Sequence, residues 1–182
     1  MAPGHRAWEF LRRHPSLRPS GLLGALLGVA SCGGDDPLQG QLVINEMAGT
    51  GADFVEILNT GTGEANLSGY GVTDSDSGGN PRPTRAARFP MGTVLRPGGY
   101  ALVYLESNCP GTVTVPCVRA EVGIGHSSGD RVHVLSPTDQ SVVSERYPAT
   151  AAPSGRSYGR IPNGTGAFQV TLRTPGAVNA AP

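Results

Sequence analysis

Short apolar runs separated by turn-forming residues are the feature that most constrains the fold of this chain. Glycine and proline supply 27 and 16 of its 182 residues, and each disfavours a helix interior, by about 1 and 3 kcal/mol respectively. This abundance excludes a long-helix or coiled-coil protein. It does not indicate disorder, because 38% of the residues are hydrophobic and only 15% are charged, whereas disordered chains are rich in charge and poor in apolar residues.

The apolar runs have the length and spacing of β-strands. Runs of four to seven residues separated by Gly, Pro, Asn and Asp are typical of an antiparallel sandwich or barrel. Arg131–Leu135 also alternates polar and apolar residues, as a half-buried strand does. We therefore expect an all-β fold of seven to nine strands. The runs are Leu42–Met47, Phe54–Leu58, Tyr70–Val72, Tyr100–Leu105, Arg131–Leu135, Val142–Tyr147 and Phe168–Leu172.

Residues 1–31 have the pattern of a lipoprotein signal peptide. Four arginines precede the apolar run Gly21–Ala30, which is the order found in secretory signals, and the run is shorter than the roughly 20 residues of a membrane span. Val29-Ala30-Ser31-Cys32 resembles the lipobox of bacterial lipoproteins, in which the cysteine is lipidated and becomes the new N-terminus. The resemblance implies a bacterial protein that is lipid-anchored through Cys32 in the cell envelope, in the periplasm or on the outer-membrane surface. The alternative is an ordinary secretory signal with a chance cysteine.

Removal of that signal would change the charge of the chain. The whole sequence has 14 Arg, no Lys and 14 acidic residues, whereas the part from Cys32 onward has 10 Arg and 13 acidic residues. Such a mildly acidic chain has no electrostatic reason to bind nucleic acid, whose affinity comes mainly from cations placed on phosphates. Residues 32–41 would form a lipidated N-terminus and short polar linker, which keeps the folded part, residues 42–180, close to the membrane.

Two cysteines remain after Cys32. Cys109 and Cys117 are separated by Pro-Gly-Thr-Val-Thr-Val-Pro, and a pair of this kind in an oxidising compartment indicates a disulfide. A metal site is the alternative, but His126 and His133 do not stand at a recognisable ligand spacing from the pair.

Eight ordered motifs together resemble the lamin tail domain in sequence and spacing. They are Leu42–Glu46, Asp53–Asn59, Asn66–Asp74, Phe89–Pro90, Leu95–Tyr100, Ser128–Leu135, Ser157–Gly164 and Thr174–Asn179. The resemblance implies an immunoglobulin-like antiparallel β-sandwich over residues 42–180, with no known active site. The segment Asn108–Arg119 looks like an insertion relative to the family pattern, and inserted loops are where function is often added to a sandwich.

The competing class is a small exported serine hydrolase. Gly125-His126-Ser127-Ser128-Gly129 matches the G-x-S-x-G elbow, in which Ser127 would be the nucleophile. That chemistry needs a strand-to-helix turn and a later acid and histidine. Here a strand-like run follows Gly129, and His133 stands inside it. A Gly- and Ser-rich connection explains the segment at least as well.

Two further groups of acidic residues have a pattern that can carry chemistry. Glu46 and Glu56 are expected on neighbouring strands, where such a pair is used by glycosidases or accepts hydrogen bonds within the sandwich. The structural role is favoured, because both belong to motifs of a non-catalytic domain. Asp74 and Asp76 have the alternating oxygens that calcium favours, but the loop lacks the third acidic position, and Asp and Ser also simply form turns.

The sequence thus predicts a non-catalytic lipoprotein that acts in recognition, adhesion or structure. Its expected partners are the membrane, through the lipid, and an envelope protein or polysaccharide. The expected recognition surface is formed by the loops Asp74–Arg88 and Asn108–Arg119.

Overall fold

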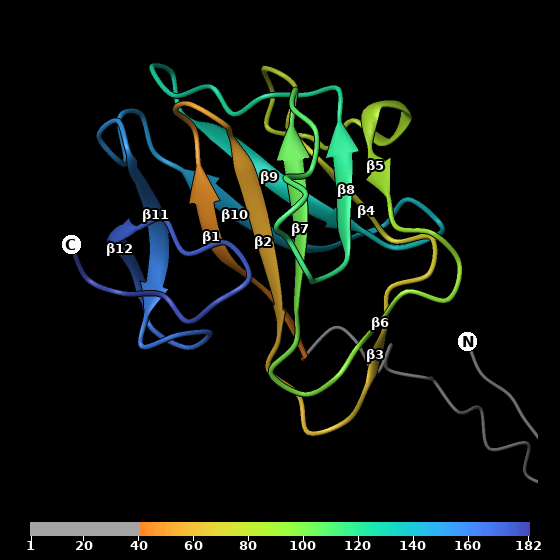
Figure 1. Ribbon diagram of the computed structural model, residues 1–182. Helices are drawn as coiled ribbons and strands as arrows, with labels where there is room; N and C mark the ends of the chain where they lie inside the picture. The colour runs from red at the N-terminus through yellow and green to blue at the C-terminus, as the bar shows by residue number, and fades with distance from the viewer. Residues whose placement is uncertain (1–40) are drawn as a thin grey trace, which may run out of the picture. The chain divides into compact units, whose positions relative to one another are not determined.

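Residues 41–182 are described by a computed structural model, in which strands joined by short turns account for the regular structure (Figure 1). The strands are β1 (Leu42–Ala48), β2 (Phe54–Asn59), β3 (Ala65–Asn66), β4 (Gly71–Thr73), β5 (Ala87–Arg88), β6 (Val94–Leu95), β7 (Tyr100–Leu105), β8 (Cys117–Ala120), β9 (Asp130–Leu135), β10 (Ser141–Tyr147), β11 (Arg156–Ile161) and β12 (Ala167–Leu172). One single-turn 3-10 helix, η1, spans Pro83–Arg85. None of the helical residues in this part of the chain forms a segment long and apolar enough to cross a membrane.

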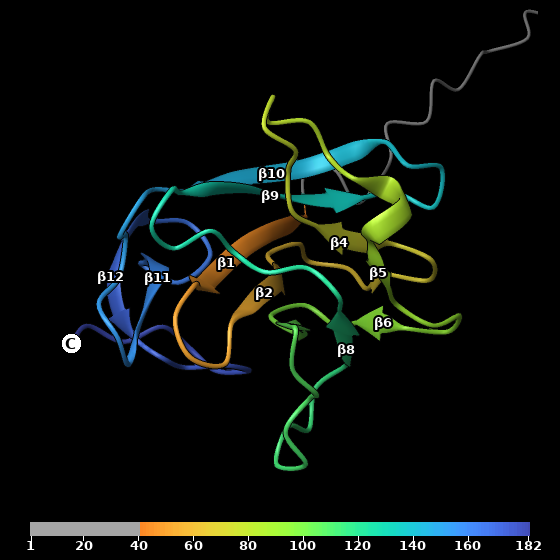
Figure 2. The same cartoon turned by 90° about the horizontal axis from the view of Figure 1, so that it is seen from above.

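The strands form two main layers. One sheet has the order β12-β11-β1-β2-β7-β8 and the other has the order β10-β9-β4-β5, with a small third sheet of β3 and β6. Viewed from above, β9 and β10 lie in one layer and β1 and β2 in the other (Figure 2). The predicted β-sandwich is therefore confirmed, and nine of the described strands have three or more residues.

The main core lies between these two sheets. Ile44 and Ile57 from the six-stranded sheet and Val72 and Val134 from the four-stranded sheet are fully buried in one apolar cluster. Side chains alternate between the faces of a strand, so the apolar residues of each run meet in this layer. The seven runs expected to be strands all become strands, as β1, β2, β4, β7, β9, β10 and β12.

One pairing departs from the expected antiparallel pattern. β8 lies beside β7 in parallel, with Leu102 opposite Cys117 and Leu105 opposite Ala120. A parallel neighbour requires a crossover connection, and residues 106–116 provide it without a helix. The segment that looked like an insertion thus carries the chain to the edge of the six-stranded sheet and adds a strand there.

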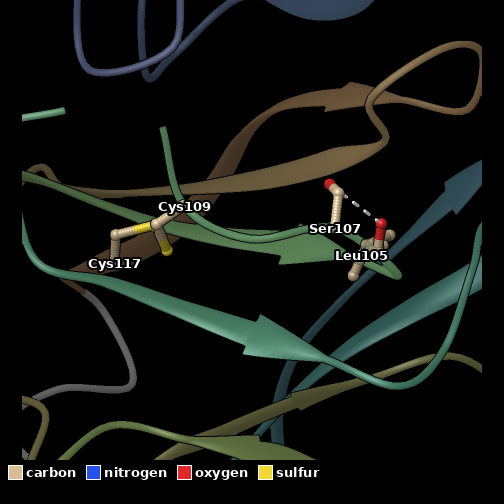
Figure 3. Close-up of a disulfide and its surroundings, with 4 residues drawn as sticks. All are labelled: Leu105, Ser107, Cys109 and Cys117. Atoms are coloured by element: carbon tan, nitrogen blue, oxygen red, sulfur yellow. Dashed lines mark hydrogen bonds between the residues drawn. A yellow bond between two sulfur atoms is a disulfide. The ribbon is translucent and has the colours of Figure 1, made fainter. Parts of the chain in front are cut away.

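The disulfide predicted from the sequence lies in this crossover. Cys109 and Cys117 are joined, with their Cα atoms 6.1 Å apart. Figure 3 shows this bond and, further back along the chain, Ser107, whose hydroxyl donates to the Leu105 carbonyl oxygen at 3.3 Å. We call residues 109–117 the disulfide loop.

The disulfide loop covers a second apolar cluster on the outer face of the six-stranded sheet. Phe54, Leu102 and Tyr104 are buried there and pack against loop residues that include Val113 and Val115. The residues adjacent to these three along β2 and β7 point into the main core instead. The loop therefore shields apolar sheet surface that would otherwise face water.

Loss of the disulfide should destabilise the fold without changing its architecture. A sequence separation of 8 corresponds to about 2.5 kcal/mol in the chain-entropy account of cross-links. We expect the double variant Cys109→Ser/Cys117→Ser to lose about that much free energy of unfolding in urea titrations. Reductant should bring the wild-type protein to the same value and leave the variant unchanged. Equal stability of the reduced and oxidised wild type would contradict this expectation.

Candidate functional site

A polar hollow opens where β9 begins and β10 ends. Its volume is about 470 Å³, and it is lined by Ser75–Ser77 and Gly79 of the loop after β4, by Ser128–Asp130 of the turn before β9, and by Arg131 and Arg146. Every lining residue is polar, charged or glycine. The first of the two loops expected to form the recognition surface therefore does line a concave site.

The outer wall of the hollow is a tight turn organised by one carboxylate. Asp76 Oδ1 accepts hydrogen bonds from the backbone N–H groups of Gly78 at 2.8 Å and Asn80 at 2.9 Å. These amides, that of Asn80 first, lower the pKa of Asp76 below its usual value. Gly79 has φ of +81°, a conformation that side chains disfavour. The carboxylate of Asp76 is thus committed to holding the loop in shape.

A histidine of β9 supports this wall from beneath. His133 Nε2 lies 3.2 Å from the Gly79 carbonyl oxygen, and Nδ1 lies 2.9 Å from the Ser141 hydroxyl. A carbonyl can only accept, so Nε2 carries the proton, and Nδ1 accepts from Ser141 in the neutral ring. Burial lowers the pKa of His133, which favours that neutral form. His133 lies on the polar face of the alternating strand, but the loop after β4 covers it, and 5% of the residue remains exposed.

Asp130 connects the loop wall to the turn wall. Its Oδ1 accepts from the Ser75 hydroxyl at 2.8 Å, and its Oδ2 accepts from the Gly125 N–H at 3.2 Å. Gly129, which precedes it, has φ of +76°, and a Cβ there would lie 2.9 Å from the Ala149 nitrogen. The turn therefore needs glycine, and the Asp130 carboxylate is committed to structure like that of Asp76.

The two calcium candidates do not form a joint site. Asp74 Oδ2 lies 2.9 Å from Arg82 Nη1 in an ion pair, and Asp74 Oδ1 accepts from the Thr73 hydroxyl, whereas Asp76 holds the backbone turn. Within residues 41–182 no group of three or more His, Cys, Asp or Glu side chains is placed to hold a metal ion. Turn formation, the alternative considered for this segment, is what the structure shows.

Ser127 occupies an exposed position in the turn that leads into β9. A strand follows it, where the nucleophile elbow requires a helix. The Ser127 hydroxyl makes no hydrogen bond to a histidine among the described residues, and His126 Nδ1 instead lies 3.5 Å from the Tyr147 hydroxyl. The Gly125–Gly129 segment thus serves as one wall of the hollow through Ser128 and Gly129.

Glu46 and Glu56 face each other directly across β1 and β2. The register moves from Ile44 opposite Ile57 to Glu46 opposite Glu56, which leaves Asn45 as an extra, bulged residue. Both glutamates are fully buried. The expectation that they lie on neighbouring strands is confirmed.

Both carboxyl groups hold the segment that follows β12, Thr174–Asn179, which we call the C-terminal segment. Glu46 accepts from the Thr174 N–H at 3.0 Å and from the Thr174 hydroxyl at 2.9 Å, and also from the Ser157 hydroxyl. Glu56 accepts from the Gly176 N–H at 2.7 Å and from Asn45 Nδ2 at 2.8 Å. The pair is covered by the chain and bonded within it, so the structural role favoured from the sequence is confirmed.

Burial raises the pKa of both glutamates. The pKa of Glu56 rises to about 8, chiefly through desolvation, and the neighbouring charge of Glu46 adds to the rise. Desolvation also raises the pKa of Glu46, but hydrogen bonds from Ser157 and Thr174 oppose it, as does the charge of Arg173. Glu56 is therefore mainly protonated at neutral pH.

The second expected recognition loop has its own, smaller depression. A pocket of about 150 Å³ lies between Pro110 and Thr112–Val115 of the disulfide loop and Pro175–Gly176 of the C-terminal segment, with Tyr104 beneath. The two expected loops thus form separate surfaces. Cys32 and the signal peptide lie outside the described residues.

Sequence reasoning did not find the two arginines of the hollow. Arg131 was recognised as an outward residue of its strand, but Arg146 stood in a run noted only for its apolar residues. The structure places them directly opposite each other. Strand register decides this neighbourhood, and register is not visible in the pattern of a single strand.

Comparison with known proteins gives one family. A family model described as Lamin Tail Domain matches residues 36–149, which include β1 through β10. No curated protein matches the chain. Strands β11 and β12 and the C-terminal segment follow the matched region and complete the six-stranded sheet.

Replacing Glu56 with glutamine should flatten the dependence of stability on pH. The folded-state pKa of Glu56 is raised to about 8 from 4.5, so its stabilising contribution is complete below about pH 4.5 and is lost as pH rises through 8. One proton gives a slope of at most about 1.4 kcal/mol per pH unit. Urea unfolding between pH 5 and pH 8.5 should show this decline in the wild type and a smaller one in Glu56→Gln.

Glu64→Gln is the matched control, because Glu64 is exposed in a loop, and it should retain the wild-type slope. His133 acts in the opposite direction, because its lowered pKa makes the free energy of unfolding fall as pH drops below the ordinary pKa of histidine. The wild type, Glu56→Gln and Glu64→Gln share that effect. Parallel slopes for the wild type and Glu56→Gln would show that Glu56 is ionised in the folded protein.

Proposed function

This chain belongs to the lamin tail domain family, and on that premise we propose that it is a non-catalytic, membrane-anchored recognition module of the cell envelope. The family is a non-enzymatic, immunoglobulin-like domain that acts as a structural or interaction module. The role in recognition, adhesion or structure expected from the sequence follows from that membership.

The polar hollow is the observation that carries the recognition role. Its two carboxylates are used to hold backbone amides, whereas Arg131, Arg146 and the exposed Ser77 line the space without a carboxylate partner. Rigid walls with free polar groups are what a binding site requires. In a sandwich, loops positioned by a rigid scaffold commonly carry such sites.

The lipid anchor is supported by the order of basic segment, apolar run and lipobox-like residues that ends at Cys32. The disulfide between Cys109 and Cys117 agrees with an oxidising compartment such as the periplasm or the outer-membrane surface. A short linker to Gln41 would keep the hollow near the membrane. Envelope proteins and polysaccharides are then the molecules within reach.

The anchor is tested by fractionating the cells that produce the protein. The wild type should sediment with membranes, whereas Cys32→Ala should be recovered in the soluble envelope fraction, because the thioether-linked lipid would be absent. Detergent should release the wild type. Equal membrane association of both proteins would contradict anchoring through Cys32.

The recognition role is tested by crosslinking in intact cells. Ser77→Trp fills the hollow with a bulky side chain at an exposed loop position, and Ser154→Trp places the same residue at an exposed turn that does not line it. We expect a specific envelope protein or polysaccharide to copurify with the wild type and with Ser154→Trp. Ser77→Trp should lose it. A partner that Ser77→Trp retains, or no specific partner with the wild type, would contradict recognition through the hollow.

A further inference from the structure

Arg131 and Arg146 lie side by side in the hollow, and neither forms an ion pair with a carboxylate of residues 41–182. They are directly opposite in the register of β9 and β10, where Cβ atoms lie about 4.5–5.5 Å apart and like charges repel. Arg131 donates from Nη1 to the Ser144 hydroxyl at 3.3 Å. Arg146 is exposed and makes no hydrogen bond or ion pair within residues 41–182.

Five other arginines among residues 41–182 have carboxylate partners. Arg82 faces Asp74 at 2.9 Å, Arg88 faces Asp139, and Arg160 faces Glu145. The hollow itself contains two acids, Asp76 and Asp130, and neither forms an ion pair with Arg131 or Arg146. Their oxygens already accept from backbone amides and from Ser75. The sequence thus places two guanidinium groups side by side and gives neither a carboxylate.

An anion that bridges the two guanidinium groups would remove this repulsion. Guanidinium binds carboxylate and phosphate through paired N–H donors, and such charge-assisted bonds are stronger than neutral ones. The rest of the lining offers serine hydroxyls, glycine backbone and the two carboxylates that hold the walls, Asp76 and Asp130, and no apolar side chain. A ligand for this site therefore combines one anionic group with several hydroxyls.

We propose that the hollow binds an acidic saccharide, with its carboxylate or phosphate held between Arg131 and Arg146 and its hydroxyls against the serine-lined loop wall. The volume of about 470 Å³ falls in the range of small-ligand sites, about 300–1,000 Å³. This inference rests on the proposed recognition role and names the ligand class for it. Among the envelope molecules considered there, it selects acidic polysaccharide.

Calorimetric titration of the full-length protein in nonionic detergent tests the proposal. The probes are trigalacturonate, its carboxyl-reduced neutral counterpart, and inorganic phosphate. We expect trigalacturonate to bind, and to bind more weakly as salt is raised. The neutral trisaccharide should not bind, and inorganic phosphate should bind at least tenfold more weakly than trigalacturonate. Equal binding of the neutral sugar, or of phosphate, would overturn the proposal.

Arg146→Ala should weaken trigalacturonate binding by at least about tenfold, as expected for loss of a charge-assisted contact. Its melting temperature should equal or exceed that of the wild type, because the substitution removes repulsion and no bond. Arg146→Lys keeps the positive charge but lacks the paired N–H donors of guanidinium. Its affinity for trigalacturonate should lie between those of the wild type and Arg146→Ala. Arg96→Ala is the matched control, since Arg96 is exposed and outside the hollow, and it should bind like the wild type. Wild-type affinity in Arg146→Ala would refute the assignment.

The two proposals fail in distinguishable ways. If crosslinking recovers a partner that Ser77→Trp loses while trigalacturonate does not bind, the hollow is a recognition site and the saccharide assignment is wrong. If trigalacturonate binds through Arg146 while intact cells yield no partner, the ligand class stands and the cellular role is wrong.

Discussion

The fold depends on a buried polar contact between its first two strands and its last residues. Irregular backbone that covers a sheet must find partners for its N–H groups, because an unsatisfied buried donor costs about 1–3 kcal/mol. Glu46 and Glu56 meet this need for Thr174 and Gly176. Asn179 adds a bond to the Asn45 carbonyl oxygen at 3.0 Å. The C-terminal segment can therefore lie against β1 and β2, and the outer face of the sheet is closed.

Acidic side chains also accept hydrogen bonds from backbone amides around the hollow, where the consequence is a binding surface. Asp76 and Asp130 organise the loop and the turn by accepting from their amides. A carboxylate used in this way keeps its charge but is fixed against its own loop, and neither Asp76 nor Asp130 forms an ion pair with Arg131 or Arg146. The structural use of acids thus leaves the arginines of β9 and β10 unpaired, and a binding surface arises from the way in which its walls are supported.

Much of the fold was predictable because alternation and turn residues mark strands independently of their neighbours. β8 and β11 were missed as strands for a physical reason. β8 is a short run, Cys117–Ala120, whose position depends on a crossover and not on its own pattern. β11 contains Gly159, where a Cβ would lie 2.8 Å from Asn179 Nδ2, so close packing replaces a strand-forming side chain. The hollow depends on the register between β9 and β10 and on a loop folded over His133, and neither is encoded within one run.

The contact between β1 and the C-terminal segment also sets the order in which the protein can be completed. β1 pairs with β11 as well as with β2. The strand near residue 45 is therefore complete only when it has paired with the strand near residue 158 and when the C-terminal segment, near residue 176, lies over it. Contacts so distant in sequence slow folding, because a long loop must close first. A chain that emerges N-terminus first has two unshielded glutamates in adjacent strands until Thr174 and Gly176 have appeared. The fold is therefore completed late, when the C-terminal segment docks on β1 and β2. A chain whose synthesis stops before that segment leaves these central strands uncovered.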